Sequence, residues 1–425
     1  MSNNLLFSCF IITSLLVFAS CERFDPDVEP EKNSAFIKFF GGGFTQQAAD
    51  VLELENGEFA ILGTSNAFNV SRENELYLVS ADENGNEIRS ANISAPDNVS
   101  TITQLEAVKL LETNTGFSVL VNGLSSNGVS GGFSIFNFSS ELVLENENSN
   151  FVLSTSDALV EANDFVEDSE GNFVVASTIF LDDNNSEGVI FKLNPNSQIL
   201  DSVSVFKDGN GDNSFSAIAK SEFGEERFFV VGTSESITEP GFSRVRVAEI
   251  NTNGQIAISE DRLTPSDDFI QQSQTGVDIV IIGPTQAAIL GRNGDEITGS
   301  TFFGLINLNT IQPIGEPRVL RSSSGNVLPN RMTRGLDGTL LITGSIQGAG
   351  FSGGDIYVDR VDISGNEINF PSTGGFLNYG GDGLDEGAVT FQGRDGGLVT
   401  LGSNSIDGTN SLLMLIKTDV NGFFN

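Results

Sequence analysis

Short apolar segments recur along the chain at a nearly constant interval, and each leads into glycine or another small residue. The segments at 59–62 and 340–342 are typical. The small residue marks each copy, and the markers are Gly63, Gly123, Ala176, Gly232, Gly291, Gly344 and Gly402. Successive markers lie 60, 53, 56, 59, 53 and 58 residues apart. This regularity predicts seven copies of one structural unit.

Each copy contains signals for about four short strands. A turn such as Asn56-Gly57 usually stands before the apolar segment. A second apolar strand that ends in Asp or Asn follows the marker, as in 189–194, and a further turn such as 362–366 leads into the last strand. These turns supply the positive backbone angles that tight hairpins need. No helical periodicity runs through the units.

We therefore predict an all-β chain folded as a single β-propeller with seven four-stranded blades. Four antiparallel strands per repeat make one blade, and radial closure hides the edges of the sheets. Runs of Val, Ile, Leu and Phe fit strands that are buried on both faces. A β-solenoid is the alternative, although its coils are usually shorter than this period. The second and fifth units fit the pattern least well, so six or eight blades also stay open.

The two ends of the chain suggest how the ring closes. The last unit ends in a turn at 421–425, with no fourth strand after it. Near the beginning, 36–42 has the sequence of a fourth strand and its exit turn, similar to 376–381. We therefore predict that the N-terminal strand, 36–40, completes the last blade.

The units resemble the kelch-like, SBBP and delta-60 type propeller repeats that are common in bacterial surface lipoproteins. The shared pattern is an Asp/Asn-Gly turn, an apolar strand, Gly-Ser/Thr, an apolar strand ending in Asp, and a final Asn-Gly. The resemblance covers about residues 35–425. It implies the propeller architecture. Because its motifs are structural glycines and turns, it transfers no catalytic residue.

The N-terminus reads as an export signal. An apolar run at 5–19 is too short for a transmembrane helix and leads into small residues and Cys21. The segment 18–21 resembles the lipobox of bacterial lipoproteins, in which the signal is cut before a cysteine that is then acylated. Two departures are Phe18, where leucine is usual, and the absence of Lys and Arg from 1–4. The alternative is an ordinary signal peptide with an incidental cysteine.

Cysteine usage agrees with the lipoprotein interpretation. Cys9 lies in the segment 1–20 that would be removed, which leaves Cys21 as the first residue and the only thiol. The acidic, proline-containing segment 21–34 is predicted to be a flexible tether before the propeller at 35–425. It resembles the acidic export signals of surface-exposed lipoproteins of the Bacteroidetes. We expect an exported protein, anchored by lipid to the outer membrane on its periplasmic or cell-surface side.

Charge narrows the choice of partners. The chain has 57 acidic and 21 basic residues, no histidine and a net charge of -36. This charge repels phosphate backbones, so no nucleic acid is expected as a partner. It favours cations and basic partners, or it is simply a solvated acidic coat that keeps the protein soluble and monomeric.

Few kinds of catalysis fit this sequence. The absence of histidine excludes Ser-His-Asp catalysis and His-ligated zinc. No phosphate-binding G-x-x-x-x-G-K-[ST] motif is present. A glycosidase needs only two carboxyl groups, but no pair stands out in the sequence. We therefore assign no catalytic residue and expect no cofactor, with calcium as the one open possibility.

Two groups of residues are candidates for ligand binding. Asp208, Asn210 and Asp212 match the opening of a calcium loop, although Asn213 replaces the usual Gly, and an ordinary turn is the alternative. Four arginines fall close together at the junction of the fifth and sixth units, where they could bind an anionic sugar or carboxylate or else pair with neighbouring acids. They are Arg318, Arg321, Arg331 and Arg334.

The sequence favours a binding or scaffold module at the cell envelope over an enzyme, because a repeat architecture is combined with an absence of catalytic motifs. Its ligand would be a protein or a glycan. The alternative is a carbohydrate-active enzyme, a hydrolase or a lyase, that uses carboxylates or Arg in the central funnel of the propeller.

Overall fold

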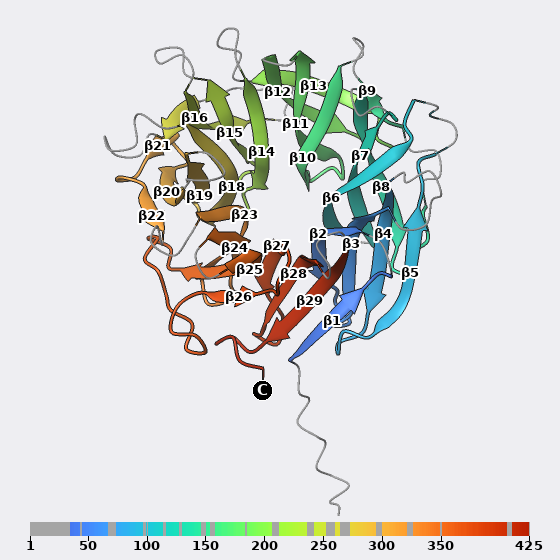
Figure 1. The fold of residues 1–425 in the computed structure, drawn as a ribbon. Coiled ribbons are helices and arrows are strands. Elements are labelled where there is room, and N and C mark those ends of the chain that lie inside the picture. Colours follow the sequence, from blue (N-terminus) through green and yellow to red (C-terminus); the bar gives the residue numbers. More distant parts are fainter. Residues whose placement is uncertain are drawn as a thin grey trace, which may run out of the picture. The chain divides into compact units, whose positions relative to one another are not determined.

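In the computed structural model the protein is built from strands and turns (Figure 1). Residues 34–425 form one compact unit. No helix long and apolar enough to cross a membrane occurs in the described part of the chain. The described residues are 35–42, 45–66, 74–96, 99, 101–113, 116–126, 130–145, 150–153, 158–182, 185–205, 212–235, 242–251, 260–263, 273–294, 300–320, 326–348, 351–405 and 410–424.

The strands form seven antiparallel sheets, which confirms the predicted all-β fold and the count of seven blades. Blade 1 consists of β2 (Gln46–Glu53), β3 (Phe59–Ser65), β4 (Glu75–Ala81) and β5 (Glu87–Ile93), and blade 2 of β6 (Gln104–Thr113), β7 (Gly116–Leu124), β8 (Gly131–Ser139) and β9 (Val152–Leu153). Blade 3 consists of β10 (Leu159–Glu167), β11 (Phe173–Asp182), β12 (Asn185–Leu193) and β13 (Ile199–Val205), and blade 4 of β14 (Asn213–Lys220), β15 (Phe228–Glu235), β16 (Ser243–Ile250) and β17 (Glu260–Leu263).

The remaining blades follow the same order from the channel outwards. Blade 5 consists of β18 (Gln274–Gly283), β19 (Gln286–Asn293), β20 (Ser300–Asn307), β21 (Gln312–Pro313) and β22 (Arg318–Leu320). Blade 6 consists of β23 (Asn326–Arg334), β24 (Leu340–Gly348), β25 (Phe351–Val361) and β26 (Leu377–Tyr379), and blade 7 of β27 (Glu386–Gln392), β28 (Leu398–Ser405), β29 (Ser411–Thr418) and β1 (Phe36–Phe40).

The hydrophobic core is divided among the seven junctions between neighbouring blades. At the junction of blades 1 and 2, for example, Leu62 and Leu78 pack with Val119. Strand β3 is buried along its whole length, because a middle strand has a blade on each side. The outer strand β5 alternates between exposed and half-buried residues. The apolar runs in the sequence are therefore the middle strands of the blades.

The outer strands are the irregular part of the repeat. Strand β9 of blade 2 has only two residues, and in blade 5 two short segments, β21 and β22, pair separately with β20. These are the two units whose sequences fit the repeat least well. The inner three strands of both blades are complete, so the irregularity lies at the rim and does not change the blade count.

Each innermost strand contains a β-bulge at the same place, and the bulge explains the marker glycines. In blade 4 the register shifts between Phe215 and Ala217, next to Gly232 on the second strand. A Cβ atom at Gly232 would lie 2.0 Å from the backbone oxygen of Ser214, so in blade 4 glycine allows the bulged strand to approach this closely. In blade 2 the residue at this position is Val121, two before the marker chosen from the sequence.

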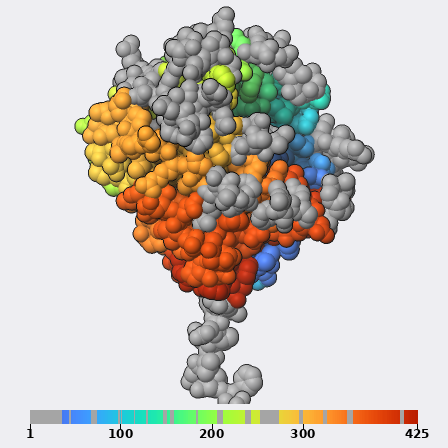
Figure 2. Space-filling model, turned by 60° about the vertical axis from the view of Figure 1, so that its left-hand side comes forward, coloured from blue at the N-terminus to red at the C-terminus, as the bar shows by residue number. Residues whose placement is uncertain are grey.

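The ring closes as the sequence predicts. Strand β1 pairs antiparallel with β29, with Phe36 opposite Lys417 and Phe40 opposite Leu413. Phe40 is only 3% exposed and joins the core between blades 7 and 1, whereas Phe39 is 51% exposed. The blue N-terminal strand accordingly lies against the red C-terminal blade (Figures 1 and 2). The predicted signal 1–20 and tether 21–34 lie outside the described residues.

Candidate functional site

One residue directly follows the bulge in every innermost strand. Five of these seven residues are charged and interact with one another between blades, whereas Ala217 and Val389 pack in the hydrophobic cores. The residues that follow the bulges, from blade 1 to blade 7, are Asp50, Lys109, Asp164, Ala217, Asp278, Arg331 and Val389. We call the five charged residues the channel cluster.

The three aspartates of the channel cluster join neighbouring blades. Asp164 accepts hydrogen bonds from the backbone N–H of Phe165 in its own strand at 2.8 Å and of Ile218 in blade 4 at 2.9 Å. Asp50 bridges blades 1 and 2, and Asp278 bridges blades 5 and 6, with the same two-oxygen geometry. Both oxygens of each carboxylate are therefore used to hold inner strands together.

Two cations balance these carboxylates across the channel. Lys109 forms an ion pair with Asp164, and the guanidinium of Arg331 lies 3.9 Å from Asp50. Burial raises the pKa of Asp278 to about 6 and also raises the pKa of Asp50, while Arg331 opposes both shifts. Burial alone would lower the pKa of Arg331, but Asp50 and the other two aspartates outweigh it and raise that pKa. The cluster is thus one coupled charge network.

Replacing Asp164 with alanine is expected to destabilise the ring by about 3–5 kcal/mol, because it leaves Lys109 and two buried N–H groups without their acceptor. Asp82→Ala is the matched control. Asp82 also accepts two backbone hydrogen bonds, from Asn84 and Asn86, but does so in a surface turn, and its loss should cost about 1 kcal/mol. Urea unfolding followed by circular dichroism measures both. Equal losses would show that Asp164 contributes no more than a turn.

A cavity of about 450 Å³ opens beside the channel cluster, near the beginnings of the innermost strands of blades 3 to 6. We call it the entry cavity. This volume lies in the range of small-ligand sites. Its walls combine carboxyl, guanidinium, amide and hydroxyl groups with a few apolar side chains. They include Glu161, Asp164, Thr178, Arg292, Asn330 and Arg331.

Two half-buried glutamates stand at equivalent positions on blades 2 and 3. Glu106 and Glu161 each lie two residues before the inserted residue of the bulge, and Glu161 lines the entry cavity. Burial raises the pKa of both carboxyls, and the negative charge of Glu106 raises that of Glu161 further. Because the two carboxyls interact, they lose their protons in two steps, and between the steps the pair holds one proton. Two half-buried carboxyls that share a proton are a pattern of acid–base sites.

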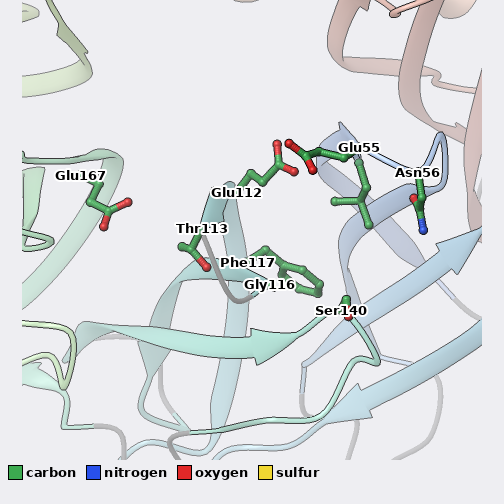
Figure 3. A pocket seen from close by; sticks show the side chains of 9 residues that line it. Glu55, Asn56, Glu112, Thr113, Gly116, Phe117, Ser140 and Glu167 are labelled. Atoms are coloured by element: carbon green, nitrogen blue, oxygen red, sulfur yellow. The ribbon is translucent and has the colours of Figure 1, made fainter.

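A second cavity, of about 670 Å³, lies where the innermost strands of blades 1 to 3 end (Figure 3). We call it the acidic cavity. The carboxylates of Glu55 and Glu112 point toward one another across it, and Glu167 faces it from blade 3. Glu55 and Glu112 are exposed to solvent. No basic side chain is among its lining residues that the structure describes, so this cavity is anionic.

The arginines that lie close together in the sequence do not share one site. Arg331 reaches the channel, whereas Arg318 lies on the outermost strand of blade 5 and bonds to Asn366. Arg334 is exposed at the end of β23, and Arg321 lies outside the described residues. A role in anion binding stays a prediction, and among the described members only Arg331 faces a cavity.

The candidate calcium loop lies only partly among the described residues. Asp208 and Asn210 lie outside the described residues, and Asp212 accepts a hydrogen bond of 3.4 Å from the hydroxyl of Ser186. Among the residues that the structure describes, no group of three or more acidic or cysteine side chains is placed to hold a metal ion. Calcium binding at 208–212 stays a prediction.

Sequence reasoning missed the aspartates of the channel cluster and the Glu106–Glu161 pair. One signal was available for the aspartates, since Asp50, Asp164 and Asp278 are separated by 114 residues each time, which is two repeats. A charged residue that recurs within an apolar strand at a multiple of the repeat marks a position facing the channel. The glutamate pair has no such signal, because it occurs in two adjacent blades only.

Comparison with known proteins identifies the fold and no family. No family model matches the chain, and no curated protein matches it in sequence. Among solved structures, the polysaccharide lyase Uly1 is similar with a TM-score of 0.50 and 10% identity, over 90% of this chain and 91% of that chain. Drosophila Semaphorin 2a is similar with a TM-score of 0.50 and 9% identity, over 90% and 75% of the two chains.

An α-L-arabinofuranosidase from Fusarium graminearum is similar with a TM-score of 0.49 and 12% identity, over 90% of this chain and 98% of that chain. The lyase and the semaphorin, which reach a TM-score of 0.50, are about 10% identical to this chain or less and differ in what they are named for, so these similarities support the fold alone.

Proposed function

We propose that the chain is a carbohydrate-active enzyme that binds a glycan in the entry cavity and hydrolyses a glycosidic bond with Glu161 and Glu106. The observation that carries this proposal is the pair of half-buried carboxyls, one lining the cavity, whose pKa values are raised by burial and, for Glu161, by the charge of Glu106. Glycoside hydrolysis needs one protonated and one ionised carboxyl group. The similarity to a polysaccharide lyase supports the fold only, so the proposal rests on these side chains.

The two glutamates would divide the chemistry according to their ionisation. Glu161, which lines the entry cavity, is assigned the shared proton and donates it to the glycosidic oxygen as the bond to the anomeric carbon breaks. Glu106, the ionised partner, receives a proton from the attacking water or attacks the anomeric carbon itself. The carboxylates of the channel cluster are already engaged by backbone N–H groups, so they hold the frame rather than react.

The test is the release of reducing ends from a panel of neutral and acidic polysaccharides by the purified full-length protein. Release without an unsaturated, ultraviolet-absorbing product supports hydrolysis. An unsaturated product would instead identify a lyase. Binding of a glycan without cleavage of any member of the panel would overturn the enzymatic proposal.

That last outcome corresponds to a second candidate function, a glycan-binding module at the envelope. It is favoured by the same two-oxygen bonding of Asp50, Asp164 and Asp278, which leaves the most deeply placed carboxylates with structural partners. In this case the entry cavity would hold a sugar without reacting.

We also propose that the protein is a lipoprotein of the outer membrane, anchored through Cys21 and displayed on the periplasmic or cell-surface side. The support is the apolar run before Cys21 and the acidic segment after it, which resembles an export signal of the Bacteroidetes. The propeller begins with β1, close behind this segment, so the tether would leave the ring at blade 7.

Substituting Cys21 with serine is expected to abolish incorporation of labelled fatty acid and to move the protein from the membrane to the soluble fraction of cells. Cys9→Ser is the matched control and should leave labelling unchanged, because Cys9 lies in the segment that is removed. Labelling that survives in Cys21→Ser would contradict the anchor.

A further inference from the structure

Arg292 has no hydrogen-bond or ion-pair partner for its guanidinium among the described residues, in a protein that has almost three times as many acids as bases. It lies on β19 of blade 5, opposite Thr275 on the innermost strand, and lines the entry cavity. Its Nε atom is buried and has no hydrogen-bond partner, and the side chain makes no ion pair with any residue that the structure describes. The other cations near the channel, Lys109 and Arg331, face the aspartates.

This arrangement is unusual on physical grounds. Withdrawing part of a guanidinium from water without a compensating acceptor costs free energy. Glu161, Asp164 and Asp278 line the same cavity, yet Arg292 forms no ion pair with them or with any other acid in the described part. An unpaired guanidinium in a cavity can bind an anionic group of the ligand. Its planar shape allows two parallel hydrogen bonds to a carboxylate or a sulfate.

Uncharged groups around Arg292 fit the rest of a sugar. The hydroxyls of Thr275 and Ser214 line the same cavity, and neither makes a hydrogen bond with a described residue. Glu161 stands on blade 3, two blades away across the cavity. A ligand that places an acidic group on Arg292 can therefore extend toward the proposed acid–base pair.

We propose that Arg292 is a specificity-determining residue that binds the acidic group of an anionic glycan, namely the carboxylate of a uronic acid. This inference rests on the proposed function in that the glycan occupies the entry cavity. It names the substrate class, and it distinguishes the cavity from the acidic cavity at the other end of the channel, which would repel such a ligand.

The first test observes Arg292 directly. In the ¹⁵N-labelled full-length protein, the Nε–Hε signal that disappears in Arg292→Lys belongs to Arg292. This signal is expected to shift saturably on titration with sodium galacturonate and to stay in place with galactose. Galactose 6-sulfate is the arm that distinguishes sulfate from carboxylate, and a shift with the sulfate alone would replace the uronate by a sulfated sugar. A signal that moves with neither anion overturns the inference.

The second test measures affinity for a uronate tetrasaccharide by calorimetry. Arg292→Gln should weaken binding by about 10- to 100-fold, and Arg292→Lys, which keeps the charge but not the planar fork, should weaken it less. Arg334→Gln is the matched control, because Arg334 is exposed at the end of β23. Equal affinity of the wild type and Arg292→Gln overturns the inference.

The two proposals fail separately. Cleavage of neutral glycans, with an Arg292 signal that does not respond to anions, removes the inference and leaves the proposed hydrolase. A response of Arg292 to galacturonate without cleavage of any glycan removes the hydrolase and leaves an anion-binding cavity.

Discussion

A chain that begins at residue 42 is expected to lose its folded, monomeric state. It lacks β1, so β29 loses its pairing partner over five residues and becomes an exposed edge strand. It also lacks Phe40, which fills the core between blades 7 and 1. We expect the free energy of unfolding to fall by more than about 5 kcal/mol, which is comparable with the whole stability of many domains. Size-exclusion chromatography and thermal unfolding measure the effect.

Two controls separate ring closure from general damage. A chain that begins at residue 34 keeps β1 and should behave as the complete protein does. Within β1, Phe40→Ala should cost about 3–5 kcal/mol, while Phe39→Ala, at a neighbouring residue that is 51% exposed, should cost less than about 1 kcal/mol. Similar losses at both positions would mean that β1 contributes little through its buried face.

Glu161→Gln is expected to lower kcat by about 10²- to 10⁴-fold on any glycan that the protein cleaves, because the amide cannot donate a proton to the leaving oxygen. Binding should change little, so the loss should appear in kcat rather than in KM. Glu167→Gln is the matched control. Glu167 lies at the other end of the same strand, in the acidic cavity, and its replacement should leave the rate unchanged.

The pH dependence of the activity tests the same role of Glu161, because it predicts in which direction the activity changes with pH. Glu161 acts in its protonated form and its pKa is raised by burial and by Glu106. Activity should therefore persist above the ordinary glutamic acid pKa of about 4.3 and fall as the pH rises through the raised value. Glu161→Gln should remove this decline from the profile of its residual activity. A decline that survives in the variant would assign the acid to another group.

The fold could be predicted because its signals are local. Buried middle strands recur in every unit and turns such as Asn56-Gly57 and Asp337-Gly338 in most of them, and a lone strand at 36–40 matches the strand that the last unit lacks. The position of the bulge was less accessible, and in blade 2 the marker glycine was two residues from its structural equivalent, Val121. Glycine at this position reflects the approach of two strands, which a spacing alone does not reveal.

The candidate site was harder to predict because closure of the ring creates it. Asp50 and Arg331 are near one another only because blades 6 and 1 face the same channel. Conversely, Arg318 and Arg331 are close in the sequence but separate in space, since one lies on the rim and the other at the centre. Arg292 lay outside the arginine group altogether. Clustering along the chain was therefore a poor guide to clustering in the channel.

The bridging aspartates join the blades in pairs, and because the ring has seven blades, one blade stays without a partner. They join blades 1 and 2, 3 and 4, and 5 and 6, which leaves blade 7 with Val389 at this position. The chain thus reads as three duplicated two-blade modules followed by a single blade. Blade 7, which has no bridging aspartate, is also the blade that β1 completes. A pulling force on the N-terminus would therefore act on the β1–β29 pairing before it reached any pair of blades that an aspartate joins. The mechanical strength of the molecule would then depend on that one ladder of five residue pairs.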